Sequence, residues 1–119
     1  MTQADLIQNF IDSANAAIYL KDDQGCFLMV NHRVAEMFNA SKDEIIGKTD
    51  YDFVSREDAD MFRGYDRQVA EAGVPMTFEA TVLLPDGEHT VIDHKFPVSN
   101  IERSPNAVGG IAIDVTKNG

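Results

Sequence analysis

The last apolar run of the chain, Val108 to Thr116, constrains the fold more than any other stretch. It is short and rich in β-branched residues, with two glycines near its start and polar residues at its end. A continuous apolar run of this length predicts a strand that is buried on both faces. Because it is also the last structural element expected in the chain, we expect this strand to connect the core with whatever follows.

Hydrophobic periodicity and turn residues predict the other elements. The predicted strands are residues 17–21, 26–30, 76–84, 88–98 and 108–116. The predicted helices are residues 4–14, 32–39 and 56–72, with short turns at 42–46 and 50–53. Strands at both ends with helices grouped between them indicate an α+β fold, in which a five-stranded antiparallel sheet carries the helices on one face. The last strand must then lie between the first and the fourth.

Capping residues support the helix boundaries. Asn31 is a candidate N-cap for the second helix, and the spacing of Ser41 and Glu44 is that of a capping box. Gly73 followed by Pro75 ends the longest helix. We therefore expect short, well-delimited helices.

Composition narrows the class of protein. A single cysteine among 119 residues excludes an internal disulfide and a cysteine-based zinc site. The net charge of −10 is not offset by any basic cluster. We therefore expect no nucleic-acid partner, since phosphate binding needs a cationic face. There is no run of 18 apolar residues and no signal-peptide pattern, so we also expect no direct contact with a membrane.

Several segments, taken in order, resemble PAS domains. They are Ala17–Asp22, Gly25, Phe27–Asn31, Ile46–Phe53, Glu79, Asp86-Gly87, Lys95–Pro97 and the closing run Gly109–Thr116. The closing run matches the Asp-hydrophobic-Thr motif with which many PAS domains end. The resemblance covers roughly residues 5–117. It implies an N-terminal amphipathic helix over residues 1–14 and a PAS domain over residues 15–117, with strand order 2-1-5-4-3.

The resemblance implies a sensory and regulatory role rather than an enzyme. PAS domains occur in histidine kinases of two-component systems, in cyclic-dinucleotide enzymes and in other signalling proteins. They often hold a small ligand between sheet and helices, and they often form dimers. We therefore expect a homodimer with an effector domain in the same parent chain. Its expected location is the cytoplasm, or the cytoplasmic part of a membrane-bound sensor.

The known cofactor classes can be tested against single positions. Flavin photosensors of the LOV type carry a cysteine where this chain has Asp50, and Cys26 lies far along the chain from that place. Haem-binding PAS domains commonly use a histidine on the long helix, and residues 56–72 contain none. No two histidines have the spacing of a helical metal site. The expected cofactor is none, or an unknown small organic ligand; flavin bound without an adduct has no residue in its favour.

A ligand pocket is expected between the long helix and the last three strands, and a packed core without a cavity is the alternative. The candidate lining residues are Phe53, Phe62, Tyr65, Asp66, Val69, Phe78, Ala80, Val82, Gly110 and Ala112. Asp93 and Lys95 alternate with Ile92 and His94, so the two pairs face opposite sides of the sheet. We expect Lys95 to point outward into solvent. If it pointed inward, a ligand that carries a carboxylate would be plausible.

Two further sets of residues are assigned to signalling. Asp114 and Thr116 lie where the chain leaves the sheet and are candidates for signal relay. The first helix presents an apolar face, the candidate dimer interface, made of Leu6, Ile7, Phe10 and Ile11. In the last strand, the small residues are expected to border the pocket and the branched ones to meet that helix or a partner.

Two alternative functions stay open on sequence grounds. One is an interaction module that dimerises without a ligand. The other, more remote, is a small α+β enzyme that uses Asp93 with His94, or Tyr51 with Asp66, for proton transfer. Adjacent strand residues point to opposite faces, and no nucleophile motif or phosphate loop is present, so we assign no catalytic residue.

Overall fold

The computed structural model describes residues 1–117, which form one antiparallel sheet with helices packed on one face. The strands are β1 Ala17–Lys21, β2 Phe27–Val30, β3 Met76–Leu84, β4 Gly87–Val98 and β5 Ala107–Asp114. Their spatial order is β2-β1-β5-β4-β3, and every neighbouring pair is antiparallel. The predicted fold class and strand order are confirmed, and β5 lies between β1 and β4.

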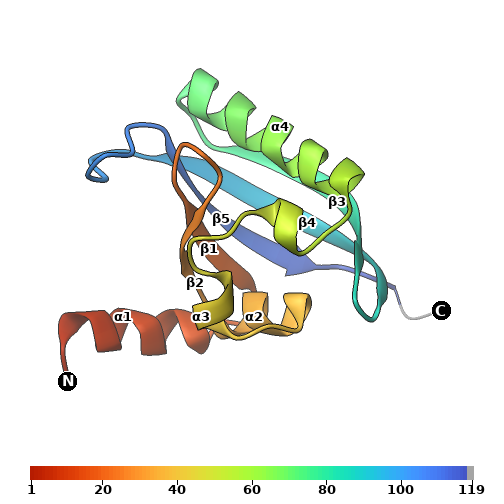
Figure 1. Ribbon diagram of the computed structural model, residues 1–119, viewed down its shortest axis with the longest axis horizontal. Helices are drawn as coiled ribbons and strands as arrows, with labels where there is room; N and C mark the ends of the chain where they lie inside the picture. The colour runs from red at the N-terminus through yellow and green to blue at the C-terminus, as the bar shows by residue number, and fades with distance from the viewer. Residues whose placement is uncertain (118–119) are drawn as a thin grey trace.

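All helices follow the predicted boundaries to within two residues; the largest difference is at α1, which ends at Asp12 instead of residue 14. Their bounds are α1 Gln3–Asp12, α2 His32–Phe38, α3 Lys42–Ile45, the 3-10 turn η1 Asp50–Asp52 and α4 Arg56–Ala72. Asn31 caps α2, and the Ser41–Glu44 capping box opens α3, as the sequence predicts. Gly73, at φ 69°, ends α4 in the left-handed region that favours glycine. Figure 1 shows α4 along β3 and β4, with α1 at the opposite end of the molecule.

The two faces of β5 differ sharply. Gly110 and Ala112 are buried and face the helices, whereas Ile111 and Ile113 are 37% and 51% exposed on the other side. The small residues therefore lie on the inner face of the sheet, and of these two only Ala112 lines the cavity described below. The prediction of burial on both faces is wrong for the second half of this strand, because no helix of the described chain covers its outer side.

Asn31 fastens α1 to the sheet. Its side chain is fully buried and makes four hydrogen bonds: its amide donates to the carbonyls of Ile11 and Ala16, and its oxygen accepts from the backbone of Ile18 and Val34. This single side chain therefore joins α1, β1 and α2. It fixes the position of α1 beside α2 rather than over the outer face of the sheet.

Candidate functional site

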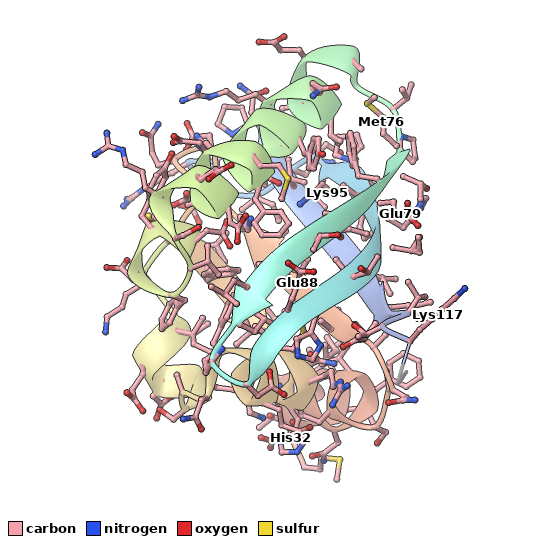
Figure 2. All side chains as sticks on the ribbon, turned by 90° about the vertical axis from the view of Figure 1, so that its right-hand side faces the viewer. His32, Met76, Glu79, Glu88, Lys95 and Lys117 are labelled. Carbon is pink, nitrogen blue, oxygen red and sulfur yellow. The ribbon has the colours of Figure 1, made fainter. Side chains whose placement is uncertain are left out.

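A buried ammonium group lies at the centre of the interior. Lys95, on β4, is 1% exposed, and its Nζ donates to Asp66 Oδ1 at 2.9 Å and to the Tyr19 hydroxyl at 2.7 Å. Asp93 Oδ2 is a third neighbour, at 3.2 Å. Figure 2 shows Lys95 between the strands and α4. The predicted outward orientation of Lys95 is wrong, because acceptors on three elements satisfy its charge inside the protein.

A second buried lysine completes the cluster. Lys21, on β1, is 3% exposed, and its Nζ donates to Asp50 Oδ2 at 2.6 Å and to Asp66 Oδ2 at 3.0 Å. Asp66, on α4, therefore bridges both lysines. The Tyr19 hydroxyl hydrogen is shared between the two oxygens of Asp93, at 2.9 and 3.0 Å. Within residues 1–117, every buried side-chain nitrogen and oxygen has a hydrogen-bond partner.

The cluster holds its charges by mutual pairing. Burial opposes the charged form of Lys95, but Asp66 and Asp93 outweigh it and raise the pKa of the ammonium. Burial also opposes ionisation of Asp66, yet Lys21 and Lys95 lower the pKa of its carboxyl group. Burial and the nearby Asp93 raise the pKa of Tyr19 well above its usual value, so the phenol stays neutral. We call these six residues, Tyr19, Lys21, Asp50, Asp66, Asp93 and Lys95, the charge cluster.

An apolar cavity of about 60 Å³ lies against the charge cluster. Its polar lining residues are Tyr19, Lys21, Asp50, Asp93 and Lys95, all from the cluster. Its apolar lining residues are Ala17, Phe27, Val34, Met37, Phe38, Phe62, Val82, Leu84, Val91 and Ala112. Apolar walls with a few convergent polar groups are the usual composition of a small-molecule site.

Of the ten candidate lining residues, some line the cavity and most lie elsewhere. Three of them line the cavity: Phe62, Val82 and Ala112. Asp66 lies directly behind its wall, bonded to both lysines. The remaining six lie elsewhere. Phe53 stacks on Phe38, and Tyr65 stacks on Phe78 with ring centroids 4.1 Å apart. Val69 and Ala80 are buried in the core, and Gly110 lies against the ring of Tyr19.

The cavity lies closer to β1 and α2 than the sequence suggests. Ala17, Tyr19 and Lys21 all face it, while Ile18 and Leu20 face the outside of the sheet. The sequence analysis did not assign Ala17, Tyr19 and Lys21 to the pocket. The hydrophobicity of Ile18 and Leu20 favours burial of the opposite face of β1. The signal that could have found the inward residues is the two-residue alternation of β1, read together with its partner strand, which pairs Tyr19 with Gly110.

A smaller polar cluster lies where the chain leaves the sheet. His89 Nδ1 is 2.6 Å from Asp114 Oδ2, and His89 Nε2 is 2.7 Å from Asp86 Oδ1. Asp114 Oδ1 also accepts from the backbone amide of Thr116, and the Thr116 hydroxyl accepts from the backbone of Thr90. The two predicted relay residues therefore contact each other and β4. His89 is partly buried in this cluster, with 20% of its side chain accessible.

Two carboxylates set the protonation state of His89. Because both ring nitrogens face carboxylate oxygens, both must donate, which requires the imidazolium form. The hydrogen bonds with Asp86 and Asp114 raise the pKa of His89. Partial burial opposes ionisation of Asp114, but hydrogen bonds from Thr116 and His89 lower its pKa to about 2.

The described chain offers neither a metal cluster nor a membrane span. No three His, Cys, Asp or Glu side chains among residues 1–117 converge in a way that could hold a metal ion. No helix in the same range has both the length and the apolar character needed to cross a bilayer.

Comparison with known proteins gives a family and several structural neighbours. A family model described as the PAS fold matches residues 11–118. An uncharacterized protein of Sinorhizobium fredii, y4lL, is 28% identical over 103 residues, which are 84% of this chain and 12% of that protein. The chain therefore spans only about an eighth of the curated relative that it matches.

Two solved structures show the same fold at low identity. Vibrio cholerae VqmA, in complex with a ligand and DNA, has a TM-score of 0.81 and 22% identity, over 96% of this chain and 51% of VqmA. The PAS domain of Bordetella pertussis BvgS has a TM-score of 0.76 and 23% identity, over 97% of this chain and 88% of that one. At these identities the likeness concerns the fold.

Proposed function

The chain belongs to the PAS fold family, and on that premise we propose that it is a sensory domain that binds a small molecule in the cavity beside the charge cluster. The observation that carries the proposal is the position of buried charge. Burying five ionised side chains costs free energy that an apolar core would not cost. These side chains lie at or directly behind the wall of a cavity, where convergent polar groups can orient a ligand. Ligand binding would therefore explain why the charges are buried there.

The proposed signal path runs along β5. Ala112 lines the cavity, and two residues later Asp114 holds His89 and Thr116 at the point of exit. A ligand that displaces the wall at Ala112 would therefore shift a rigid strand whose far end is held by the Asp114 contacts. We propose that this strand passes the change to an effector domain of a longer, cytoplasmic parent chain.

Native mass spectrometry of the protein purified from its own source tests the ligand. We expect a small molecule that remains bound in the folded wild type and is released on denaturation. Ala112→Leu, which fills the cavity, should be purified without it, whereas Ile113→Leu on the outer face of the same strand should retain it. Bare protein in all three samples would contradict the proposal.

A second candidate function is dimerisation, and the outer face of the sheet favours it. Ile111, Ile113 and Val115 are between 37% and 51% exposed, and Leu6 and Phe10 on α1 are 59% and 79% exposed. Exposed apolar patches of this kind mark protein interfaces. We propose a homodimer that covers this face, with α1 contributing to it.

Sedimentation velocity tests the homodimer. Ile113→Lys should convert the protein to a monomer, because it places a charge in the centre of the proposed interface. Leu83→Lys is the matched control, since Leu83 is 61% exposed at the end of the edge strand β3. A wild type that sediments as a monomer would leave ligand sensing as the only proposed function.

The negative charge of this domain argues against nucleic-acid binding by the domain itself, but not by other parts of a longer protein. VqmA, part of which has the same fold, was solved in complex with DNA. We propose that this domain does not itself contact nucleic acid, because its net charge is −10. This proposal does not extend to the effector domain, which can bind nucleic acid or not.

A further inference from the structure

The chemical class of the ligand follows from how the ammonium hydrogens of the charge cluster are used. Lys95 has three, and three acceptors surround it: Asp66, Asp93 and the Tyr19 hydroxyl. Lys21 donates two, to Asp50 and Asp66. Its Nζ also lies 5.1 Å from the ring centroid of Tyr19 and 5.3 Å from that of Phe27. Lys95 therefore has no hydrogen left for the carboxylate of a ligand, whereas Lys21 has one hydrogen that no carboxylate of the cluster accepts, and two aromatic rings lie near it.

The net charge of the cluster also disfavours a ligand that carries a carboxylate. Two ammonium groups face three carboxylates, so the cluster as a whole, including Asp66 behind the cavity wall, carries one excess negative charge. An anion placed there would meet a like charge in a region of low dielectric constant. An uncharged molecule avoids that repulsion, and a cation gains from it.

One acceptor of the cluster is open. Asp50 Oδ2 binds Lys21, whereas Asp50 Oδ1 has no hydrogen-bond partner within residues 1–117; since every fully buried side-chain oxygen in this range has a partner, Oδ1 must be an accessible atom. Asp50 lines the cavity, and 10% of its side chain is accessible. A ligand with a hydroxyl, amide or amine hydrogen could bind it.

The walls set the size and shape of the ligand. Aromatic rings of Phe27, Phe38 and Phe62 surround the cavity, an arrangement that suits a flat apolar ring. The present volume of about 60 Å³ is below the roughly 150 Å³ of an engineered cavity that binds benzene. A ring therefore needs side chains to move. Met37, Phe38 and Phe62 come from helices and are only half-buried, so we expect these side chains to move rather than those of the sheet.

We propose that the cavity takes an uncharged or cationic molecule with a single small ring and a hydrogen-bond donor directed at Asp50, and that it discriminates against carboxylates of the same size. This inference rests on the proposed ligand-sensing function and deepens it. It also reverses the sequence-based expectation that an inward Lys95 would favour a carboxylate, because that charge is already neutralised by Asp66 and Asp93.

A titration followed by amide NMR tests the proposal with three probes of nearly equal shape: benzyl alcohol, benzylammonium and benzoate. We expect the first two to shift the amide signals of Asp50 and Ala112, and benzoate to bind at least tenfold more weakly. Asp50→Asn removes the excess negative charge and should reduce the gap between benzylammonium and benzoate to less than threefold. Asp43→Asn, an exposed change on α3, should leave the gap unaltered.

The outcomes separate this proposal from the proposed function. Benzoate that binds as tightly as benzyl alcohol would overturn the ligand class and leave ligand sensing intact. A selectivity that Asp50→Asn does not change would overturn the role given to Asp50. If no probe of any charge shifts the signals around the cavity, both the ligand class and the ligand site are refuted.

Discussion

Replacing Lys95 by methionine tests the energetic weight of the charge cluster. Methionine keeps the length and most of the apolar stem of the side chain but removes the ammonium group. Asp93 then keeps only the Tyr19 hydroxyl as a side-chain partner, and Asp66 keeps only Lys21. The net charge of the cluster changes from −1 to −2.

The expected loss is large. Removing one partner from a buried ion pair destabilises a protein by about 3–5 kcal/mol, because it leaves the other charge without compensation. Folded domains of this size are stable by only about 5–15 kcal/mol in total. With a denaturant slope of about 2 kcal/mol per molar urea, the unfolding midpoint should fall by roughly 1.5–2.5 M.

Urea unfolding at pH 7, followed by far-UV circular dichroism, measures this loss. Lys48→Met is the matched control, since Lys48 is exposed, and its free energy of unfolding should change by no more than about 0.5 kcal/mol. Adding Asp93→Asn to Lys95→Met should recover part of the loss, because it removes the charge that was left unpaired. An equal midpoint for Lys95→Met and Lys48→Met would refute the reasoning, as would a double variant that is less stable than the single one.

Three further predictions concern single contacts. Asn31→Ala should lower the free energy of unfolding by at least about 2 kcal/mol, because buried backbone groups in α1, β1 and α2 lose their partner; a loss below 0.5 kcal/mol in urea unfolding would contradict this role. Gly110→Ala should cost about 1–3 kcal/mol, since the added Cβ would lie 2.1 Å from the buried ring of Tyr19; Gly109→Ala, which meets the half-buried Phe96, should cost less, and the reverse order would refute the packing argument. The contact of His89 with Asp114 should be pH-dependent: the raised pKa of His89 means that its stabilisation is present below the usual value of about 6.5 and is lost as pH rises through the higher folded value. The lowered pKa of Asp114 means that its share is present above the usual value of 3.8 and is lost as pH falls toward about 2. The wild type should therefore exceed His89→Gln in urea midpoint at about pH 5.5 and approach it at about pH 9; a constant difference would count against the ion pair.

The fold was largely predictable because local signals agree with one another. The cap at Asn31, the box at Ser41 and the stop at Gly73 mark helix ends through hydrogen bonds between near neighbours in sequence. The resemblance supplied the strand order, which periodicity alone left open. The apolar run of β5 was assigned to the right place in the sheet, although its outer face is exposed.

The charge cluster was not predictable in the same way. A lysine within a strand is usually solvated, and only the meeting of β1, β4, α4 and η1 surrounds Lys95 and Lys21 with acceptors. The partners in these bonds lie between 29 and 76 residues apart in sequence. No local pattern carries that information. The two-residue alternation in β4 predicts that Asp93 and Lys95 share a face of the sheet. Tertiary packing determines which face that is.

A crystal structure of the protein purified from its own source would test the central claim most directly. We predict electron density for one small ring between Phe62 and Ala112, with a polar atom within hydrogen-bond distance of Asp50 Oδ1 and the lysine contacts unchanged. A cavity filled by its own side chains, without additional density, would contradict the account.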